Sequence, residues 1–173
     1  GEQEFMGLTF SVNEHVLIPR QDTEVLVEEV MKNLHDGFRI LDLCTGSGCI
    51  LLSLLHYSND CSGVGADLSE EALEVARKNA EQLGESSALF VQGDLFAPYI
   101  CSDVIPTLME EVREHEPMQA LDGGADGLDF YRKIIQGAKE HLCGGGQLFF
   151  EIGYDQGEAV QRLMEQAGYR EVE

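Results

Sequence analysis

The residues with the most chemical information form a glycine-rich loop that begins at an acidic residue. Residues 42–48 read DLCTGSG, a D-x-x-x-G-x-G pattern. Glycines let a backbone approach a ligand that a Cβ atom would exclude. The third glycine of a dinucleotide-binding fingerprint would fall at Leu51, and no Lys-Ser/Thr pair follows to make a P-loop. The loop therefore predicts a ligand without phosphate, held by Asp42 and by glycines along an amino-acid moiety.

Two further acids stand at the same relative place in the next two units of the chain. Asp67 can accept hydrogen bonds from both ribose hydroxyls of a nucleoside, and Asp94 can accept one from an adenine amino group. One aspartate at a strand end is as often a turn former, but three in register with a glycine loop favour a cofactor site. A sulfonium and an α-ammonium suit acids that would repel a pyrophosphate. The pattern thus predicts S-adenosylmethionine, bound by Asp42, Cys44, Thr45, Gly46, Ser47, Gly48, Asp67, Leu68, Asp94 and Leu95.

These residues must be positioned by strands and helices, which the alternation of apolar runs with helical periodicity predicts. Ser69 is a predicted helix cap, and Gly84 is the predicted end of the same helix. The alternation is typical of an α/β fold with a doubly wound, mostly parallel sheet, in which ligands bind at the carboxyl ends of the strands. The predicted strands are residues 39–44, 62–67 and 88–92, and the predicted helix between the first two is residues 47–57.

The remaining elements flank this central set. A hairpin over residues 5–16 and a helix over residues 24–34, capped by Asp22 or Thr23, are predicted before it. After it we expect helices over 103–115, 127–141 and 156–167, a strand over 146–152 entered by a turn at 144–145, and a strand from about Tyr169. Residues 1–36 are predicted to lead into a single catalytic domain formed by residues 37–173.

Composition narrows the possible partners. The 11 basic and 32 acidic residues give a net charge of -21, which disfavours a nucleic-acid substrate. The five cysteines have no zinc or redox spacing, the histidines share no ligand spacing, and no metal is expected. The cysteines are predicted to be small buried residues in a reducing compartment. No apolar run is long enough to span a membrane, so a soluble, cytoplasmic protein without a membrane partner is expected.

Several segments together resemble the HemK/PrmC family of protein-glutamine methyltransferases. The most specific are VLIPRQDTE at residues 16–24 and DGLDFYR at residues 126–132, and they are joined by TGSG at 45–48, GDLF at 93–96 and EIG at 151–153. The resemblance implies the class I, Rossmann-like methyltransferase fold. It also implies methyl transfer from S-adenosylmethionine, leaving S-adenosylhomocysteine, to the glutamine of the Gly-Gly-Gln motif of a peptide chain release factor. Arg20 is expected to contribute to substrate binding.

The chain departs from this family at the catalytic motif. The family's Asn-Pro-Pro-Tyr is reduced here to Pro98-Tyr99, and no asparagine follows Asn79. Pro98 and Tyr99 are the remaining candidates for catalysis and substrate binding. The region after residue 92 also lacks an apolar run for the family's fourth strand. We therefore expect that a segment carrying a strand that ends in Ser/Thr-Asn-Pro is missing between about Leu95 and Pro98.

Two other functions remain open from the sequence. An adenine-specific nucleic-acid methyltransferase would share the Asn-Pro-Pro-Tyr catalytic motif, although the net charge of the chain disfavours a nucleic-acid substrate. A cofactor-binding module without activity would follow from a literal reading of the absent asparagine. The helical N-terminal region with which the family recognises its substrate is also expected to be absent from this chain.

Overall fold

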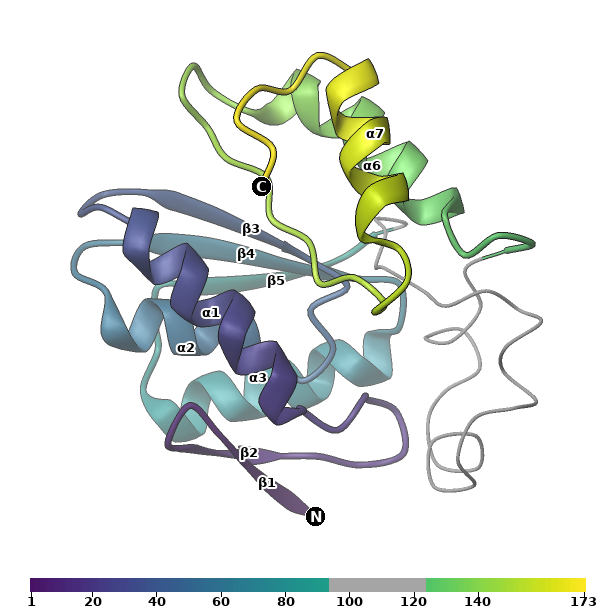
Figure 1. Cartoon of the computed structure of the whole chain (residues 1–173). Helices are drawn as coiled ribbons and strands as arrows, with labels where there is room; N and C mark the ends of the chain where they lie inside the picture. Colours follow the sequence, from purple (N-terminus) through teal and green to yellow (C-terminus); the bar gives the residue numbers. More distant parts are fainter. Residues whose placement is uncertain (94–123) are drawn as a thin grey trace. The chain divides into compact units, whose positions relative to one another are not determined.

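The computed structural model describes residues 1–93 and 124–173 (Figure 1). These two parts belong to two compact units, and each is described by itself. The predicted helix over 103–115 and the expected missing segment near Pro98 both lie outside the described residues.

The first unit begins with a tight antiparallel hairpin. Strand β1 (Glu2–Phe5) pairs with β2 (Leu8–Ser11), and Phe5 lies opposite Leu8. Met6 and Gly7 form the turn with φ values of 51° and 72°, the positive pair that a two-residue type I′ turn requires. The predicted hairpin over 5–16 was therefore placed too late. The turn forms at Gly7 because glycine adopts a positive φ without steric cost.

The helix that follows the hairpin also differs from its prediction. Helix α1 (Gln21–Asn33) begins earlier than predicted, and its N-cap is Arg20, whose side chain makes no capping hydrogen bond. Asp22 and Thr23 lie inside the first turn instead of capping it, so that prediction was wrong. Acidic residues in a first turn still stabilise a helix through the partial positive charge at its N-terminus.

A parallel three-stranded sheet forms the centre of the first unit. Its order is β3 (Arg39–Leu43), β4 (Ser62–Asp67), β5 (Ala88–Gln92), and helices α2 (Cys49–Tyr57) and α3 (Glu70–Leu83) make the connections. These strands confirm the predictions to within one residue. Ser69 caps α3 by accepting from the Ala72 amide, and Gly84 ends it with φ of 75°, as predicted.

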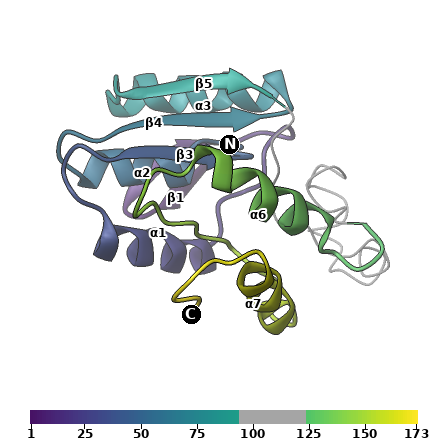
Figure 2. The same ribbon diagram turned by 90° about the horizontal axis from the view of Figure 1, so that it is seen from above.

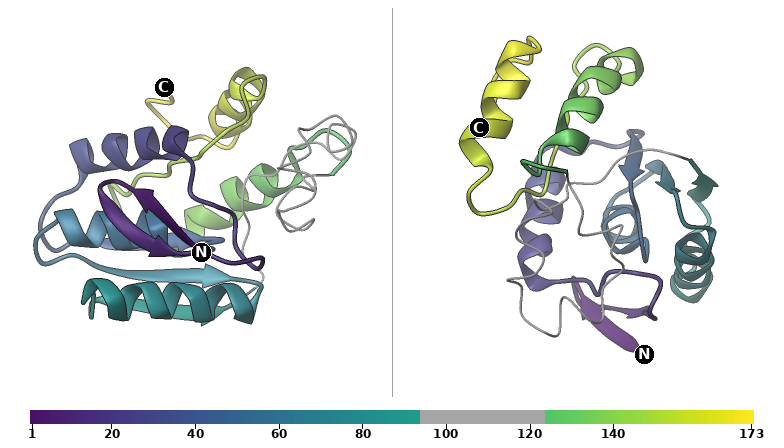
Figure 3. Two further views of the ribbon diagram at one scale, coloured as in Figure 1. Left: turned by 90° about the horizontal axis from the view of Figure 1, so that it is seen from below. Right: turned by 90° about the vertical axis from the view of Figure 1, so that its right-hand side faces the viewer.

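The first unit is built in three layers. Helices α2 and α3 cover one face of the sheet, and the hairpin lies on the side of these helices away from the sheet (Figure 2 and Figure 3). Phe5 and Phe10 meet edge to face and are buried with Val27 of α1 and Leu52 of α2. This apolar cluster joins the hairpin to the helices and is the largest part of the core.

The second unit contains two helices packed around a buried tyrosine. Tyr131 of α6 (Asp129–His141) is fully buried beside Val160 of α7 (Gly157–Gln166). Its hydroxyl donates to the Glu151 carbonyl at 3.1 Å or to Gln156 Oε1 at 3.0 Å. Burial raises the pKa of Tyr131, so the phenol keeps its proton and remains a donor. Tyr131 therefore fixes the extended segment before α7 against α6.

Two predicted strands of the second unit are not formed. Residues 146–153 form no regular element and have no partner strand among the described residues, and the chain beyond Gly168 has a bend at residues 170–171 but no strand. A strand forms only where a neighbouring strand satisfies its backbone groups, which local sequence does not report. The predicted turn at 144–145 is confirmed, since the Gly146 amide donates to the Cys143 carbonyl at 2.8 Å.

The cysteine prediction holds only in part. Cys49 and Cys61 are buried and Cys44 is partly buried, but Cys143 is exposed beside the glycine turn, so the prediction of burial was wrong there. Among the described residues, no helix has the length and apolar character needed to cross a membrane.

Candidate functional site

The glycine loop and Asp67 lie side by side at the carboxyl ends of two paired strands. In the register of β3 and β4, Leu43 lies opposite Ala66, so the residues after each strand leave the same edge of the sheet. The Thr45 amide continues this pairing by donating to the Ala66 carbonyl at 3.0 Å. The parallel pairing of β3 and β4 thus brings Asp42 and Asp67 to the same edge of the sheet, as the predicted alternation of strands and helices requires.

Asp67 holds the loop directly. Its Oδ2 accepts from the Gly46 amide at 2.9 Å, and its Oδ1 accepts from the Ser69 amide at 3.0 Å. One carboxylate therefore joins the loop after β3 to the start of α3. Each carboxylate oxygen has a further lone pair, so both can still accept from a ligand hydroxyl.

Thr45 and Asp42 are joined by a hydrogen bond within the loop. The Thr45 hydroxyl donates to Asp42 Oδ2 at 2.7 Å, and Thr45 itself is buried. Gly65 of β4 makes room for this pair, since a Cβ there would lie 2.9 Å from Thr45 Oγ1 and 2.8 Å from the Phe90 ring. Gly65 was not among the predicted site residues. The available signal was a glycine inside a strand, which often marks a close approach.

The loop backbone turns sharply and leaves one side open. Cys44, Gly46 and Gly48 have φ values of 57°, 53° and 78°. A Cβ at Gly48 would lie 3.1 Å from Leu52 and 3.3 Å from Ala76, so this glycine faces the helices. At Gly46, by contrast, the Cys44 carbonyl is the one atom of the described residues that a Cβ would meet within 4.0 Å. The loop is therefore packed at Gly48 and free to contact a ligand at Gly46.

Comparison with known proteins assigns the chain to a family. A methyltransferase domain model matches residues 34–105. The release factor glutamine methyltransferase of Thermodesulfovibrio yellowstonii is 39% identical over 191 residues, which cover 100% of this chain and 68% of the relative. The chain belongs to the release factor glutamine methyltransferase family. The Moorella thermoacetica member is 45% identical over 97% of this chain and 65% of its own length.

A solved structure supports the predicted fold class. The ribosomal protein L11 methylase of Lactobacillus delbrueckii subsp. bulgaricus aligns with a TM-score of 0.61 over 88% of this chain and 71% of its own, at 16% identity. The class I, Rossmann-like α/β fold is therefore confirmed. The alignment with the Thermodesulfovibrio protein spans 191 positions against the 173 residues here, so that family member has residues without a counterpart in this chain.

Of the other predicted site residues, the structure describes only some. Leu68 follows Asp67 and is 52% exposed, and Arg20 is exposed at the start of α1. Asp94, Leu95, Pro98 and Tyr99 lie outside the described residues. Among the described residues, no group of three or more His, Cys, Asp or Glu side chains could hold a metal ion.

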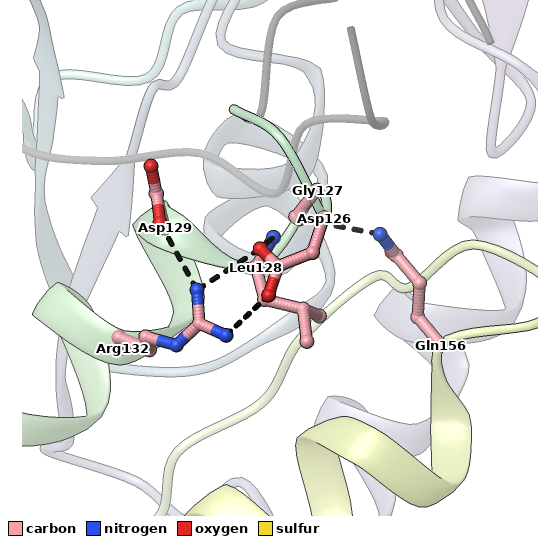
Figure 4. A network of polar contacts seen from close by, with 6 residues as sticks. All are labelled: Asp126, Gly127, Leu128, Asp129, Arg132 and Gln156. Carbon is pink, nitrogen blue, oxygen red and sulfur yellow. Dashed lines mark hydrogen bonds and ion pairs between the residues drawn. The ribbon is translucent and has the colours of Figure 1, made fainter. Parts of the chain in front are cut away.

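The family-like segment 126–132 forms the start of α6 (Figure 4). Arg132 binds the Asp126 carboxylate with both terminal nitrogens, at 3.0 and 2.5 Å, and it also donates to Asp129 at 3.0 Å. The Arg132 guanidinium lowers the pKa of Asp126 to about 2. On the other side, Gln156 Nε2 donates to the Gly127 carbonyl at 3.2 Å. In the described structure, these contacts hold the N-terminus of α6 in place.

The partly buried position of Asp42 predicts a pH-dependent stability. Burial raises the pKa of Asp42 to about 6 from its usual 3.8, although the Thr45 hydrogen bond opposes the shift. The folded state then holds this proton to a higher pH than the unfolded chain does. The stabilisation is complete below about pH 4 and is lost as the pH rises through 6. Asp42→Asn should therefore raise the free energy of unfolding above pH 7, by about 1 to 3 kcal/mol.

Urea denaturation of both proteins at pH 4 and pH 8 measures this effect. Asparagine keeps an oxygen for the Thr45 hydroxyl but cannot ionise, so the two proteins should differ little at pH 4. A difference of equal size at both pH values would show that Asp42 has an ordinary pKa. Exposed Asp36, which precedes β3, provides the control, because Asp36→Asn should have little effect at either pH.

Proposed function

We propose that this chain transfers a methyl group from S-adenosylmethionine to the side-chain amide of a glutamine in a peptide chain release factor. The names of its relatives support the substrate, and the chain spans 68% and 65% of the two compared above. The observation that carries the cofactor assignment is the bond from the Gly46 amide to Asp67 at 2.9 Å. It joins the glycine loop to the carboxylate that we propose accepts from the ribose hydroxyls.

The described residues fit this cofactor chemically. Asp67 would accept from the ribose hydroxyls, and the open backbone at Gly46 would contact the amino-acid moiety. Asp42, mostly ionised at neutral pH, would favour the positive charges of the cofactor. When bound, the cofactor supplies an electrophilic methyl on its sulfonium. Asp94 and Leu95 are proposed for the adenine, outside the described residues, and no metal is proposed.

Transfer requires the chain to orient a poor nucleophile. The lone pair of an amide nitrogen is delocalised into its carbonyl, so the nitrogen must be held with that lone pair toward the methyl. The N–CH3 bond forms as the S–CH3 bond breaks, and the nitrogen then loses a proton to water. We propose Pro98 and Tyr99 as residues that contact the substrate amide, with Arg20 as a further substrate-binding residue.

A second candidate is cofactor binding without methyl transfer. Two observations favour it: no asparagine follows Asn79, and the Thermodesulfovibrio relative has residues without a counterpart here. The glycine loop and Asp67 would bind the cofactor equally well in both cases. Binding and transfer must therefore be measured separately.

Methyl transfer from labelled S-adenosylmethionine tests the proposal. We expect label on a release factor but not on the same factor with its Gly-Gly-Gln glutamine replaced by alanine, and none on adenine-containing DNA. Calorimetric titration of the cofactor provides the second readout. Binding without transfer would select the second candidate, transfer to DNA would select a nucleic-acid methyltransferase, and absence of binding would overturn the cofactor assignment. The net charge of -21 supports a protein substrate over a nucleic acid. We propose that the reaction takes place in the cytoplasm.

A further inference from the structure

One buried asparagine joins the glycine loop to the N-terminal hairpin. Asn79 lies on α3 and is fully buried. Its Nδ2 donates to the Ser47 carbonyl at 2.9 Å and to the Ser11 carbonyl at 3.1 Å. Its Oδ1 accepts from the Ser11 amide at 2.7 Å. Three separate parts of the chain therefore meet at one side chain.

The chemistry of these contacts requires a carboxamide. Two carbonyl oxygens can only accept and the Ser11 amide can only donate, so this position needs two donors and one acceptor. A carboxylate would bring a buried negative charge against two carbonyl oxygens, and an apolar side chain would leave three buried polar groups unpaired. The orientation of the Asn79 amide is fixed for the same reason.

Asn79 and Asp67 hold adjacent residues of the loop. Asp67 binds the Gly46 amide, and Asn79 binds the carbonyl of the next residue, Ser47. One turn earlier on α3, Ala76 closes against Gly48, where a Cβ would lie only 3.3 Å away. The loop is thus held both by the residue at the end of β4 and by residues of α3.

We propose that Asn79 is a positioning residue for cofactor binding, which fixes the glycine loop through the Ser47 carbonyl. The proposal rests on the proposed cofactor site. Asn79 does not touch the cofactor itself: it acts through the Ser47 carbonyl. Without Asn79, the loop would lose the hydrogen bond to the Ser47 carbonyl, and part of the free energy of cofactor binding would be spent on ordering the loop.

Gln82 offers a matched control on the same helix. It binds the same hairpin, with Nε2 donating to the Thr9 carbonyl at 3.3 Å and Oε1 accepting from the Ser11 hydroxyl at 3.4 Å. None of these contacts involves the loop. Val27→Ala is the control for stability, because Val27 is fully buried in the hairpin cluster on α1.

The test compares Asn79→Leu, Asn79→Ser, Gln82→Ala and Val27→Ala in the whole chain. Titration with S-adenosylmethionine, at a temperature where all are folded, should show an affinity about tenfold or more weaker for both Asn79 variants. The two controls should stay within about twofold. If Asn79→Leu does not fold, the affinity of Asn79→Ser, which keeps a small polar group, still tests the proposal.

Amide hydrogen exchange of residues 45–48 gives a readout without ligand. Exchange should quicken in the Asn79 variants and remain unchanged in Gln82→Ala and Val27→Ala. Equal effects in all four variants would show a merely structural role and overturn the proposal, as would unchanged exchange in the Asn79 variants. If the unaltered chain does not bind S-adenosylmethionine, the proposed function fails, and the exchange data then test the loop contact alone.

Discussion

Replacing Asp67 by alanine is expected to weaken S-adenosylmethionine binding by about 1 to 3 kcal/mol, or roughly fivefold to 150-fold. The change removes the proposed acceptor for the ribose hydroxyls. It also leaves the Gly46 and Ser69 amides without the acceptor they use at 2.9 and 3.0 Å. Loop order and ligand contact are therefore lost together. Isothermal titration calorimetry measures the change in affinity.

Two further variants serve as controls for this measurement. Asp67→Asn keeps one acceptor oxygen and removes the charge, so its affinity should fall between those of the alanine variant and the unaltered chain. Asp36→Ala removes an exposed charge before β3 and should leave the affinity unchanged. Unchanged binding in Asp67→Ala would remove Asp67 from the site.

Gly65→Val is expected to lower the melting temperature by about 3 to 10 °C, corresponding to about 1 to 3 kcal/mol of overpacking. Valine is the better strand former, but that preference spans only about 1 kcal/mol. The clash is larger, because even the Cβ would lie 2.8 Å from the Phe90 ring and 2.9 Å from Thr45 Oγ1. Displacement of Thr45 would also break its bond to Asp42.

Thermal unfolding followed by circular dichroism measures this loss. Gly93→Ala is the control, because a Cβ at Gly93 meets no heavy atom of the described residues within 4 Å and should change the melting temperature little. A melting temperature for Gly65→Val equal to or above that of the unaltered chain would show that the space beside Thr45 is not needed.

Local signals explain what the sequence predicted well. Ser69 and Gly84 delimit α3 because a capping hydroxyl and a left-handed terminal residue act on their own neighbours. The three central strands follow from continuous apolar runs between helical segments. The meeting of Gly46 and Asp67 follows in turn, since parallel neighbours bring their carboxyl ends to one edge.

Contacts between distant residues explain what the sequence did not predict. Asn79 looks like any polar residue within a helix, and its partner Ser11 is 68 positions away. Gly65 matters only because Thr45 and Phe90 arrive beside it. The predicted strand at 146–152 failed for a related reason, because its apolar residues pack on Tyr131 while its backbone finds no described partner strand.

The layered arrangement of the first unit also sets an order of events during synthesis. The hairpin leaves the ribosome before the helices on which it packs, yet a two-stranded hairpin is at best marginally stable alone. Its apolar partners Val27 and Leu52 come later, and Asn79, which ties Ser11 to the loop, comes last. The hairpin is thus expected to be among the last parts of this unit to become fixed. The glycine loop is expected to reach its final form only after α3 has brought Asn79 to Ser47.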